Sequence, residues 1–285
     1  MQGVRSIYGN IRAHLGSDGR VHPTISARQA SGRLSITDPG LTVVGKRDGR
    51  WVEREVFLPE EGHLIVPFDL DQVDARAVAG LCQDPAYMAL FTDPKIDSHE
   101  EIAYRLWGVR DGKKGPYRNK AKRIGHAWNY GAGIARIVRE TGIAEADVRR
   151  FDEGMRTDFP LLVQWKRDMA ETARTGALMD NGFGRMMRPN PDRAHTQGPA
   201  LMGQGAARDL MMGGILRLPV EVVPMLRAGV HDEVVLSIPK DVVDDVIPVV
   251  LGALADDFRG IPITAGCEPP AENWGRCYAP RKTAK

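Results

Sequence analysis

The stretch HLIVPFDLDQVDARAVAGLC, from His63 to Cys82, joins a strand-length apolar run to a helical pattern. The run HLIVPFDL has the length and the β-branched and aromatic content of a buried strand. Pro67 lacks a backbone donor, so we expect it to weaken this strand or to lie beside a bulge. The residues after it form a helical pattern, with Asp71 in the position of an N-cap. The stretch therefore predicts a strand that ends at Asp69 and Leu70, directly before a helix.

A second β-type segment, VVPMLRAGVHDEVVLSIP (222–239), predicts two strands joined by a tight turn near Gly229–Asp232. Between the two β-type segments, residues 99–180 are mainly helical in pattern, with breaks at glycines and prolines. Strands at both ends and a helical block between them predict an α+β fold, with the block inserted into a sheet domain. Three further segments are predicted as a turn-rich loop (181–191), a helix (204–216) and a helix interrupted at Pro248 (241–258).

The composition is that of an ordinary globular protein with a locally basic segment. The chain has 285 residues, 42% hydrophobic and 27% charged, and a formal net charge of +2, which excludes a histone-like polycation. The charge is uneven, because Arg105–Arg123 contains eight Lys or Arg residues and a single acid, Asp111. Such a local basic stretch favours an anionic partner more than the net charge does.

The cysteines and the apolar segments indicate the cellular compartment in which the protein is expected. The three cysteines form no C-x-x-C pair, so we expect neither a disulfide framework nor a structural zinc site. No N-terminal apolar run resembles a signal peptide, and no stretch of about 18 apolar residues could span a bilayer. We therefore expect a cytoplasmic protein without a membrane partner.

Two aspartates occupy comparable places at strand ends. Asp69 ends the first predicted strand, and Asp232 lies at the tip of the predicted hairpin. If the strands are neighbours, the carboxylates converge and need a divalent cation or a shared proton. Oxygen ligands without a His or Cys cluster point to Mg²⁺, and two such ions about 4 Å apart could serve phosphoryl transfer. The alternative is that Asp69 only caps a helix and Asp232 only forms a turn.

A basic stripe lies on a predicted helix within RNKAKRIGHAWNYG (118–131). Residues four apart differ by only about 40° around a helix, so Arg118, Lys122 and His126 share a face, with Tyr130 at its edge. Arg can grip a polyphosphate bidentately and Lys acts as a point charge. The alternative is a solvated basic face, although the aromatic residues beside the cations are typical of nucleic-acid binding.

Several segments, in order, resemble the family A (DNA polymerase I-like) DNA polymerases. FDLDQVDARAVAGL (68–81), RNKAKRIGHAWNYG and VHDEVVLSIP (230–239) resemble motifs A, B and C of that family. Further similarity lies in SGRLSITDP, DSHEEIAYRLWG, FGRMMRP and GQGAARDLM, and the resemblance runs from about Asp18 to about Trp274.

The resemblance implies a metal and nucleotide site. Asp69 and Asp232, with the backbone carbonyl of Leu70, would hold two Mg²⁺ ions, and Glu233 would support them. Arg118 and Lys122 would hold the triphosphate of an incoming dNTP, and Lys122 would also be catalytic.

The same resemblance implies contacts with the nucleotide and the DNA. His126 stands where the family usually stacks a Phe or Tyr on the nucleotide, and Asp74 stands where a Glu blocks a ribose 2′-OH. Both departures bear on nucleotide selection. The remaining implied contacts are with the nucleotide and the templating base (Tyr130, Gly131) and with the primer terminus or the nascent duplex (Arg33, Gln204, His231).

The implied architecture is a polymerase right hand with an antiparallel palm sheet and inserted helical fingers. We expect palm in residues 1–98 and 195–285 and fingers in residues 99–194, with the thumb and exonuclease domains absent. A separate thumb or exonuclease subunit or a processivity factor would then assist on primer–template DNA. A phage or prophage gene encoding one half of a split polymerase would fit this arrangement.

The expected function is template-directed DNA synthesis by two-metal catalysis. One alternative is an RNA polymerase or primase-like relative, against which the acid at Asp74 argues. Another is a catalytically idle nucleic-acid-binding subunit, against which the retention of both Asp69 and Asp232 argues.

Overall fold

The computed structural model describes residues 2–46 and 49–280. Its internal contacts divide the chain into two compact units. The sheet unit comprises Met1–Asp71, Leu210–Asp256 and Ile263–Lys285, and the helical unit comprises Gln72–Asp209 and Asp257–Pro262.

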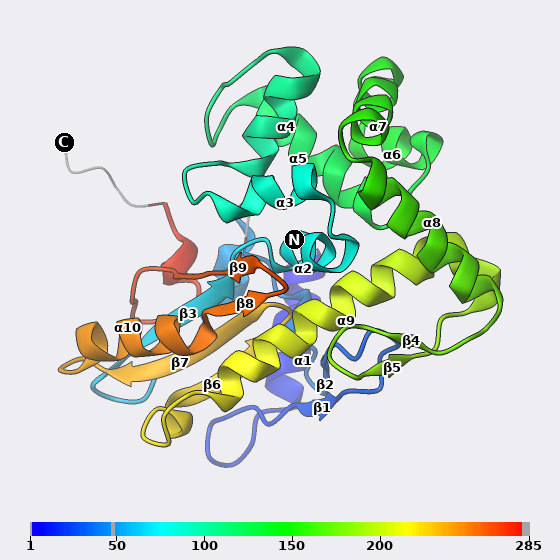
Figure 1. Ribbon diagram of the computed structural model, residues 1–285. Coiled ribbons are helices and arrows are strands. Elements are labelled where there is room, and N and C mark those ends of the chain that lie inside the picture. Colours follow the sequence, from blue (N-terminus) through cyan, green and yellow to red (C-terminus); the bar gives the residue numbers. More distant parts are fainter. Residues whose placement is uncertain (1, 47–48, 281–285) are drawn as a thin grey trace. The chain divides into compact units, whose positions relative to one another are not determined.

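The helices and strands are coloured along the sequence in Figure 1. The α-helices are α1 (Gln2–Ala13), α2 (Val73–Cys82), α3 (Pro85–Thr92), α4 (Ser98–Trp107), α5 (Pro116–Asn129), α6 (Ile134–Thr141), α7 (Glu145–Asp158), α8 (Pro160–Arg174), α9 (Ala194–Leu216) and α10 (Val243–Leu254). The strands are β1 (Thr24–Ser26), β2 (Ser35–Thr37), β3 (His63–Leu70), β4 (Met179–Asp180), β5 (Met186–Met187), β6 (Leu226–Val230), β7 (Glu233–Pro239), β8 (Asp256–Phe258), β9 (Ile261–Ile263) and β10 (Ala265–Cys267).

The sheet unit is built on a four-stranded antiparallel sheet of order β10-β3-β7-β6. The strand predicted over residues 63–70 is confirmed at both ends, and so is the hairpin of β6 and β7. Helix α10 packs against β3, β7 and β10. Around Ile65, Val235 and Trp274 the same sheet contributes to an apolar core. Because both faces are covered, β3 is an almost continuous apolar run rather than an alternating one.

Pro67 is tolerated inside β3 because its missing N–H faces away from β7, toward the segment that follows β10. Ile65, two residues earlier, exchanges both of its backbone hydrogen bonds with Ala271. Period-two geometry therefore turns Pro67 to the same side, where its carbonyl accepts from Glu268 N at 3.0 Å. The pairing of β3 with β7 is regular through this position. On the other side, the register shifts by one residue between Phe68↔Cys267 and Ile65↔Ala271, so Pro67 lies beside an irregularity, as predicted. A further register shift lies in β6, between Leu226 and Ala228.

The helical unit is stabilised by packing between neighbouring helices and by a side chain that caps two helix N-termini. Helix α5 packs mainly on α4, and α7 contacts α4, α5, α6 and α8. Asp84 is 1% exposed, and one of its oxygens accepts from Ala86 N and Tyr87 N at the start of α3. Its other oxygen accepts from Leu161 N and Leu162 N at the start of α8. One buried carboxylate thus caps two helices that lie far apart in the sequence.

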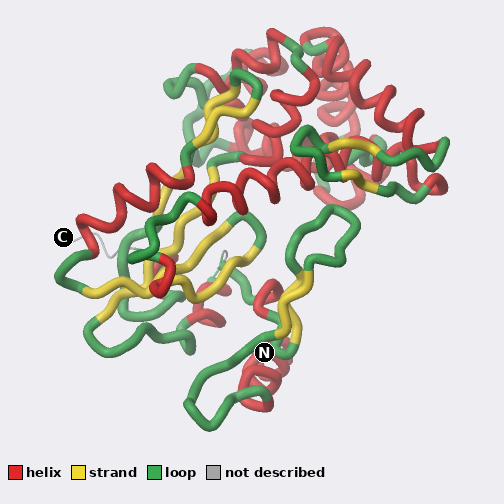
Figure 2. The backbone as a smooth tube through the Cα atoms, turned by 60° about the horizontal axis from the view of Figure 1, so that its bottom comes forward, coloured by secondary structure: helices red, strands yellow, loops and turns green. Residues whose placement is uncertain are grey.

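The helices and strands of both units can be followed as red and yellow segments of the backbone in Figure 2. An α+β fold with an antiparallel sheet and a helical block is confirmed. No helix in residues 2–46 and 49–280 is long and apolar enough to cross a membrane.

Two local predictions were wrong. Asp71 is not the N-cap of α2, because Gln72 takes that place in a left-handed conformation and the Asp71 carboxylate accepts from Thr264 Oγ1 at 2.9 Å. Pro248 does not interrupt α10, which continues through it from Val243 to Leu254; the proline removes one intrahelical hydrogen bond there. The turn-rich loop predicted over 181–191 is mostly confirmed, although it contains the two-residue strand β5, and Asn181 N donates to Arg185 O across the short hairpin with β4.

Candidate active site

The strand-end aspartates Asp69 and Asp232 meet at one end of the sheet. In the register of β3 and β7, Asp69 lies opposite Glu233, the residue after Asp232. Leu70 N donates to the backbone carbonyl of Asp232 at 3.1 Å, which fixes the turn beside the end of β3. His231 supplies the left-handed residue of this turn, with φ of 60°. The sheet therefore brings together the two carboxylates that are far apart in the sequence.

The Asp69 carboxylate is partly buried and lies close to other charged groups. Burial and the charge of Asp232 raise its pKa to about 6, although the Lys46 ammonium opposes this shift. Its Oδ2 accepts from Lys46 Nζ at 3.0 Å. Its Oδ1 is shielded from solvent and has no hydrogen-bond partner among the residues that the structure describes. A shielded carboxylate oxygen without a donor indicates a place for a cation.

Glu233 is a fully engaged carboxylate and is 3% exposed. Its Oε1 accepts from Arg54 Nη1 at 2.8 Å and from Trp274 Nε1 at 3.2 Å. Its Oε2 accepts from Lys46 Nζ at 2.9 Å and from the Tyr278 hydroxyl at 2.5 Å. Burial opposes ionisation, but the charges of Lys46 and Arg54 prevail and lower the pKa of Glu233. With both oxygens occupied, Glu233 is suited to support the site rather than to bind a metal.

The donor set fits a hard divalent cation. In the described part of the chain, no three His, Cys, Asp or Glu side chains are placed together as a complete metal cage. The end of the sheet instead offers Asp69 with its unsatisfied Oδ1, Asp232 and the backbone carbonyl of Leu70. Mg²⁺ typically takes one or two protein carboxylates and completes its shell with water and substrate phosphates. The residues present therefore fit Mg²⁺ better than a softer metal.

In the helical unit, the predicted basic stripe lies on α5, which contains Arg118, Lys122 and His126. Arg118 Nε and Nη2 both donate to Asp97 Oδ2, at 2.9 and 2.7 Å. Asp97 Oδ1 accepts from the N–H groups at the start of α4, His99 N and Glu100 N. The Arg118 guanidinium is therefore held against the N-terminus of α4.

His99 belongs to the same cationic neighbourhood. Burial, together with the charges of Arg118, Lys122 and His126, lowers its pKa to about 4, although the Asp97 carboxylate opposes the shift. Its ring is therefore neutral at pH 7. A neutral imidazole beside the cations of α5 leaves their charge available to an anion without adding to it.

Tyr130 caps the C-terminus of α5, and its hydroxyl donates to Asp74 Oδ2. Its ring meets the His126 ring edge to face, with centroids 4.9 Å apart. Gly131 follows with φ of +73°, and a Cβ there would lie 2.7 Å from His195 O. Only glycine fits this close approach without strain. The structure thus places Asp74, His126 and Tyr130 together at the end of α5.

The residues expected to contact DNA lie on three different elements. Arg33 is half-buried in the loop before β2, and Gln204 is half-buried within α9. His231 is exposed at the turn between β6 and β7.

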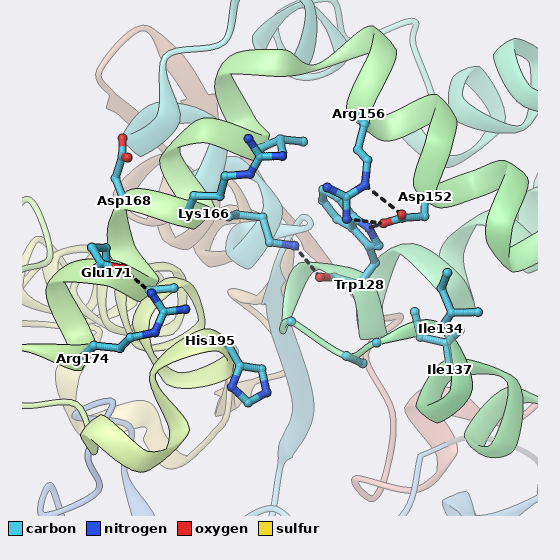
Figure 3. Close-up of a pocket in the computed structure, with 16 residues that line it drawn as sticks. Trp128, Ile134, Ile137, Asp152, Arg156, Lys166, Asp168, Glu171, Arg174 and His195 are labelled. Carbon is cyan, nitrogen blue, oxygen red and sulfur yellow. Dashed lines mark hydrogen bonds and ion pairs between the residues drawn. The ribbon is translucent and has the colours of Figure 1, made fainter.

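A cavity of about 790 Å³ lies in the helical unit, beside the C-terminus of α5 (Figure 3). Lys166, from α8, donates to Trp128 O at 2.6 Å, and its ammonium lies 3.3 Å from the centroid of the Trp128 ring. Burial lowers the pKa of Lys166 to about 7. Asp152 accepts from Trp128 Nε1 and from Arg156. These contacts hold the last turn of the helix that precedes Gly131.

Four residues of this neighbourhood were missed by reasoning from the sequence. These residues surround Glu233 and are Lys46, Arg54, Trp274 and Tyr278. No local pattern marks them, because they come from loops and 3₁₀ turns that are distant from Glu233 in the sequence. Asp97 also has a role beyond its motif, and its place before Ser98 at a helix start could have indicated an N-cap.

The chain is similar to known DNA polymerases. A DNA polymerase of Mycobacterium phage D29 is 25% identical over 264 residues, which are 92% of this chain and 43% of that protein. A thermostable DNA polymerase I of Thermus filiformis is 30% identical over 239 residues, which are 78% of this chain and 28% of that protein. The chain thus spans less than half the length of each of these relatives.

The fold also matches a solved polymerase domain. The POL domain of Pol1 from M. smegmatis, solved in complex with DNA primer-template and dNTP, superposes with a TM-score of 0.87. The match covers 98% of this chain and 52% of that one, at 19% identity, and supports the predicted palm and fingers fold. Residues 4–276 match the family described as DNA polymerase family A. The chain therefore belongs to DNA polymerase family A.

Proposed function

We propose that this chain catalyses template-directed DNA synthesis, transferring a nucleotide from a dNTP to a primer 3′-OH. The observation that carries the proposal is the convergence of Asp69 and Asp232 at neighbouring strand ends, with Asp69 Oδ1 shielded and unsatisfied among the described residues. Membership in DNA polymerase family A supports it.

In the proposed site, Asp69, Asp232 and the carbonyl of Leu70 hold two Mg²⁺ ions. Bound Mg²⁺ would lower the pKa of the primer 3′-OH and would stabilise the negative charge of the pyrophosphate leaving group. Glu233 keeps the neighbouring strand end rigid through its four hydrogen bonds. The converging negative charge of the aspartates is what the cations neutralise.

The basic stripe of α5 binds the triphosphate in this proposal. Arg118 grips phosphate oxygens through its guanidinium, and Lys122 neutralises charge that develops on the leaving pyrophosphate. Arg118 now donates two hydrogen bonds to Asp97, so triphosphate binding exchanges or shares those donors. Closure of the helix over the nucleotide would exclude water and strengthen these contacts.

The cluster at the end of α5 selects the nucleotide. His126 stacks on the base or sugar, and Tyr130 and Gly131 border the templating base. Asp74 stands against a ribose 2′-OH, and its hydrogen bond from Tyr130 holds the carboxylate in place. Arg33, Gln204 and His231 contact the primer terminus and the minor groove of the nascent duplex.

The partners proposed are primer–template DNA and dNTPs. We also propose palm in residues 1–98 and 195–285 and fingers in residues 99–194. Four further features remain predictions: a separate thumb or exonuclease subunit, a processivity factor, a phage source and a cytoplasmic location. The 25% identity to a phage D29 polymerase over most of this chain supports the phage source.

A primer-extension assay with Mg²⁺ tests the proposed activity. Asp232→Asn should lower the rate by about 10³-fold, because it removes several kcal/mol of transition-state stabilisation. Asp241→Asn is the matched control, since Asp241 is exposed beside α10, and it should extend at the wild-type rate. Equal extension by wild type and Asp232→Asn would refute the assignment of the two aspartates.

Two further measurements separate the alternatives. Competition between dNTPs and rNTPs distinguishes DNA synthesis from an RNA polymerase or primase-like activity. Binding of primer–template by the purified chain without any extension, even with its neighbouring gene product, would identify an idle binding subunit.

A further inference from the structure

Lys46 occupies an unusual place between two acids of the sheet unit. Its Nζ lies 3.0 Å from Asp69 Oδ2 and 2.9 Å from Glu233 Oε2. The side chain is 26% exposed, so the ammonium is partly withdrawn from water. An ammonium that is hydrogen-bonded to two carboxylates places a positive charge between oxygens that would otherwise repel each other.

The ammonium is anchored more firmly on one side than on the other. Glu233 is buried and also accepts hydrogen bonds from Arg54, Trp274 and Tyr278, so it cannot turn away from Lys46 without losing them. The Asp69 side chain is 44% exposed, and among the described residues the side chain that hydrogen-bonds to it is Lys46. Any cation that binds Asp69 therefore shares this carboxylate with a positive charge that stays in place.

Charge decides the effect of that arrangement. A divalent ion on Asp69 Oδ1 would lie within a few ångströms of the Lys46 ammonium, where two positive charges repel strongly in a partly buried site. The hydrogen bond from Lys46 only orients one oxygen of Asp69, which is a weaker effect. We therefore expect the repulsion between Lys46 and a bound divalent ion to weaken metal binding more than the hydrogen bond to Asp69 strengthens it.

We propose that Lys46 is a resident counter-cation that stabilises the Asp69–Glu233 acidic pair without metal and weakens divalent-cation binding at Asp69. The inference rests on the proposed function, because it takes Asp69 as a ligand of the proposed Mg²⁺ site. In this proposal, Lys46 controls the metal affinity of the site without being a metal ligand. Stable metal occupancy then requires an additional negative charge, which the triphosphate of the substrate provides.

The test measures metal binding without DNA or nucleotide, so that it does not depend on turnover. Mn²⁺ serves as the probe in a titration of the whole chain, followed by electron paramagnetic resonance of the free ion. Lys46→Met keeps the apolar stem and removes the charge, and it should tighten Mn²⁺ binding by about tenfold or more. Lys46→Arg retains the charge and should bind as wild type does.

Matched variants define the site and the background. Lys240→Met removes an exposed lysine of the same sheet unit and should leave Mn²⁺ affinity unchanged. Asp69→Asn should abolish the binding that Lys46→Met tightens. As a second readout, saturating Mn²⁺ should raise the Tm of Lys46→Met more than it raises the Tm of the wild type.

Unchanged or weaker Mn²⁺ binding by a folded Lys46→Met variant overturns the inference while leaving the proposed function intact. If Lys46→Met does not fold, Lys46→Gln replaces it, with the same two outcomes. If Asp69→Asn binds Mn²⁺ as the wild type does, the metal site of the proposed function falls, and this inference falls with it.

Discussion

Arg118 and Asp97 form an ion pair in which two guanidinium nitrogens, Nε and Nη2, converge on one carboxylate oxygen at 2.9 and 2.7 Å. The side chains are only 14% and 20% exposed. The other Asp97 oxygen caps α4. One carboxylate therefore joins the start of α4 to the basic stripe of α5.

Substitutions at Asp97 should separate its two roles. Asp97→Asn retains an N-cap acceptor but loses the ion pair, and we expect it to lower the free energy of unfolding by about 1 kcal/mol. Asp97→Ala loses both and should cost about 2–3 kcal/mol. Urea denaturation followed by circular dichroism measures both. Equal losses for the two variants would contradict a separate contribution from the ion pair.

Arg118→Ala should lower kcat/KM for dNTP by about 10- to 100-fold, since charge-assisted hydrogen bonds to phosphate contribute about 1.5–3 kcal/mol. Lys120→Ala is the control on the same helix. Lys120 Nζ pairs with Asp147 Oδ2 at 2.7 Å, away from the stripe, so its loss should change kcat/KM less than twofold. Steady-state single-nucleotide incorporation measures both. Similar losses for the two variants would argue that α5 contributes only general positive charge.

His99 should make stability depend on pH below neutrality. Its pKa is lowered to about 4, below the ordinary value of 6.5, so the unfolded chain takes up a proton at a pH where the folded one does not. Its contribution is therefore present above pH 6.5 and is lost as the pH falls from 6.5 toward 4. Between pH 7.5 and 5 this loss amounts to about 2 kcal/mol. Urea denaturation of His99→Gln should show a decline smaller by that amount, and an unchanged decline would refute it.

Gly131→Ala should destabilise the protein by about 1–3 kcal/mol, because the backbone has φ of +73° and the new Cβ would lie 2.7 Å from His195 O. Gly252→Ala is the opposite control. Gly252 lies within α10, and its Cβ would meet no atom within 4 Å, so alanine should stabilise by up to about 1 kcal/mol. Thermal unfolding compares the two. A stable Gly131→Ala variant would show that this approach of two segments is not required.

The elements that the sequence predicted well are those whose signal is local. The apolar run of β3 and the two runs of β6 and β7 contain their own β-type patterns, and the structure places these strands where the patterns lie. The four-residue spacing of Arg118, Lys122 and His126 likewise follows from one helix. These features need no knowledge of tertiary contacts.

The features that the sequence did not predict depend on distant residues. Lys46 and Glu233 are separated by 187 positions, and only the folded sheet unit brings them together. Pro67 illustrates the same point, because its effect depended on which side of β3 its nitrogen faces. Local patterns also misplaced the cap of α2, where a backbone turn at Gln72 takes the place of a side-chain cap at Asp71.

The most direct test of the central claim compares binding with chemistry in the aspartate variants. Asp69→Asn and Asp232→Asn should bind primer–template with wild-type Kd in fluorescence anisotropy, because neither residue is expected to grip the DNA. In single-turnover incorporation of one dNTP with Mg²⁺, each variant should be slower than the wild type by about 10³-fold. Incorporation by either variant at the wild-type rate would contradict the proposal that these two carboxylates hold the catalytic metal ions.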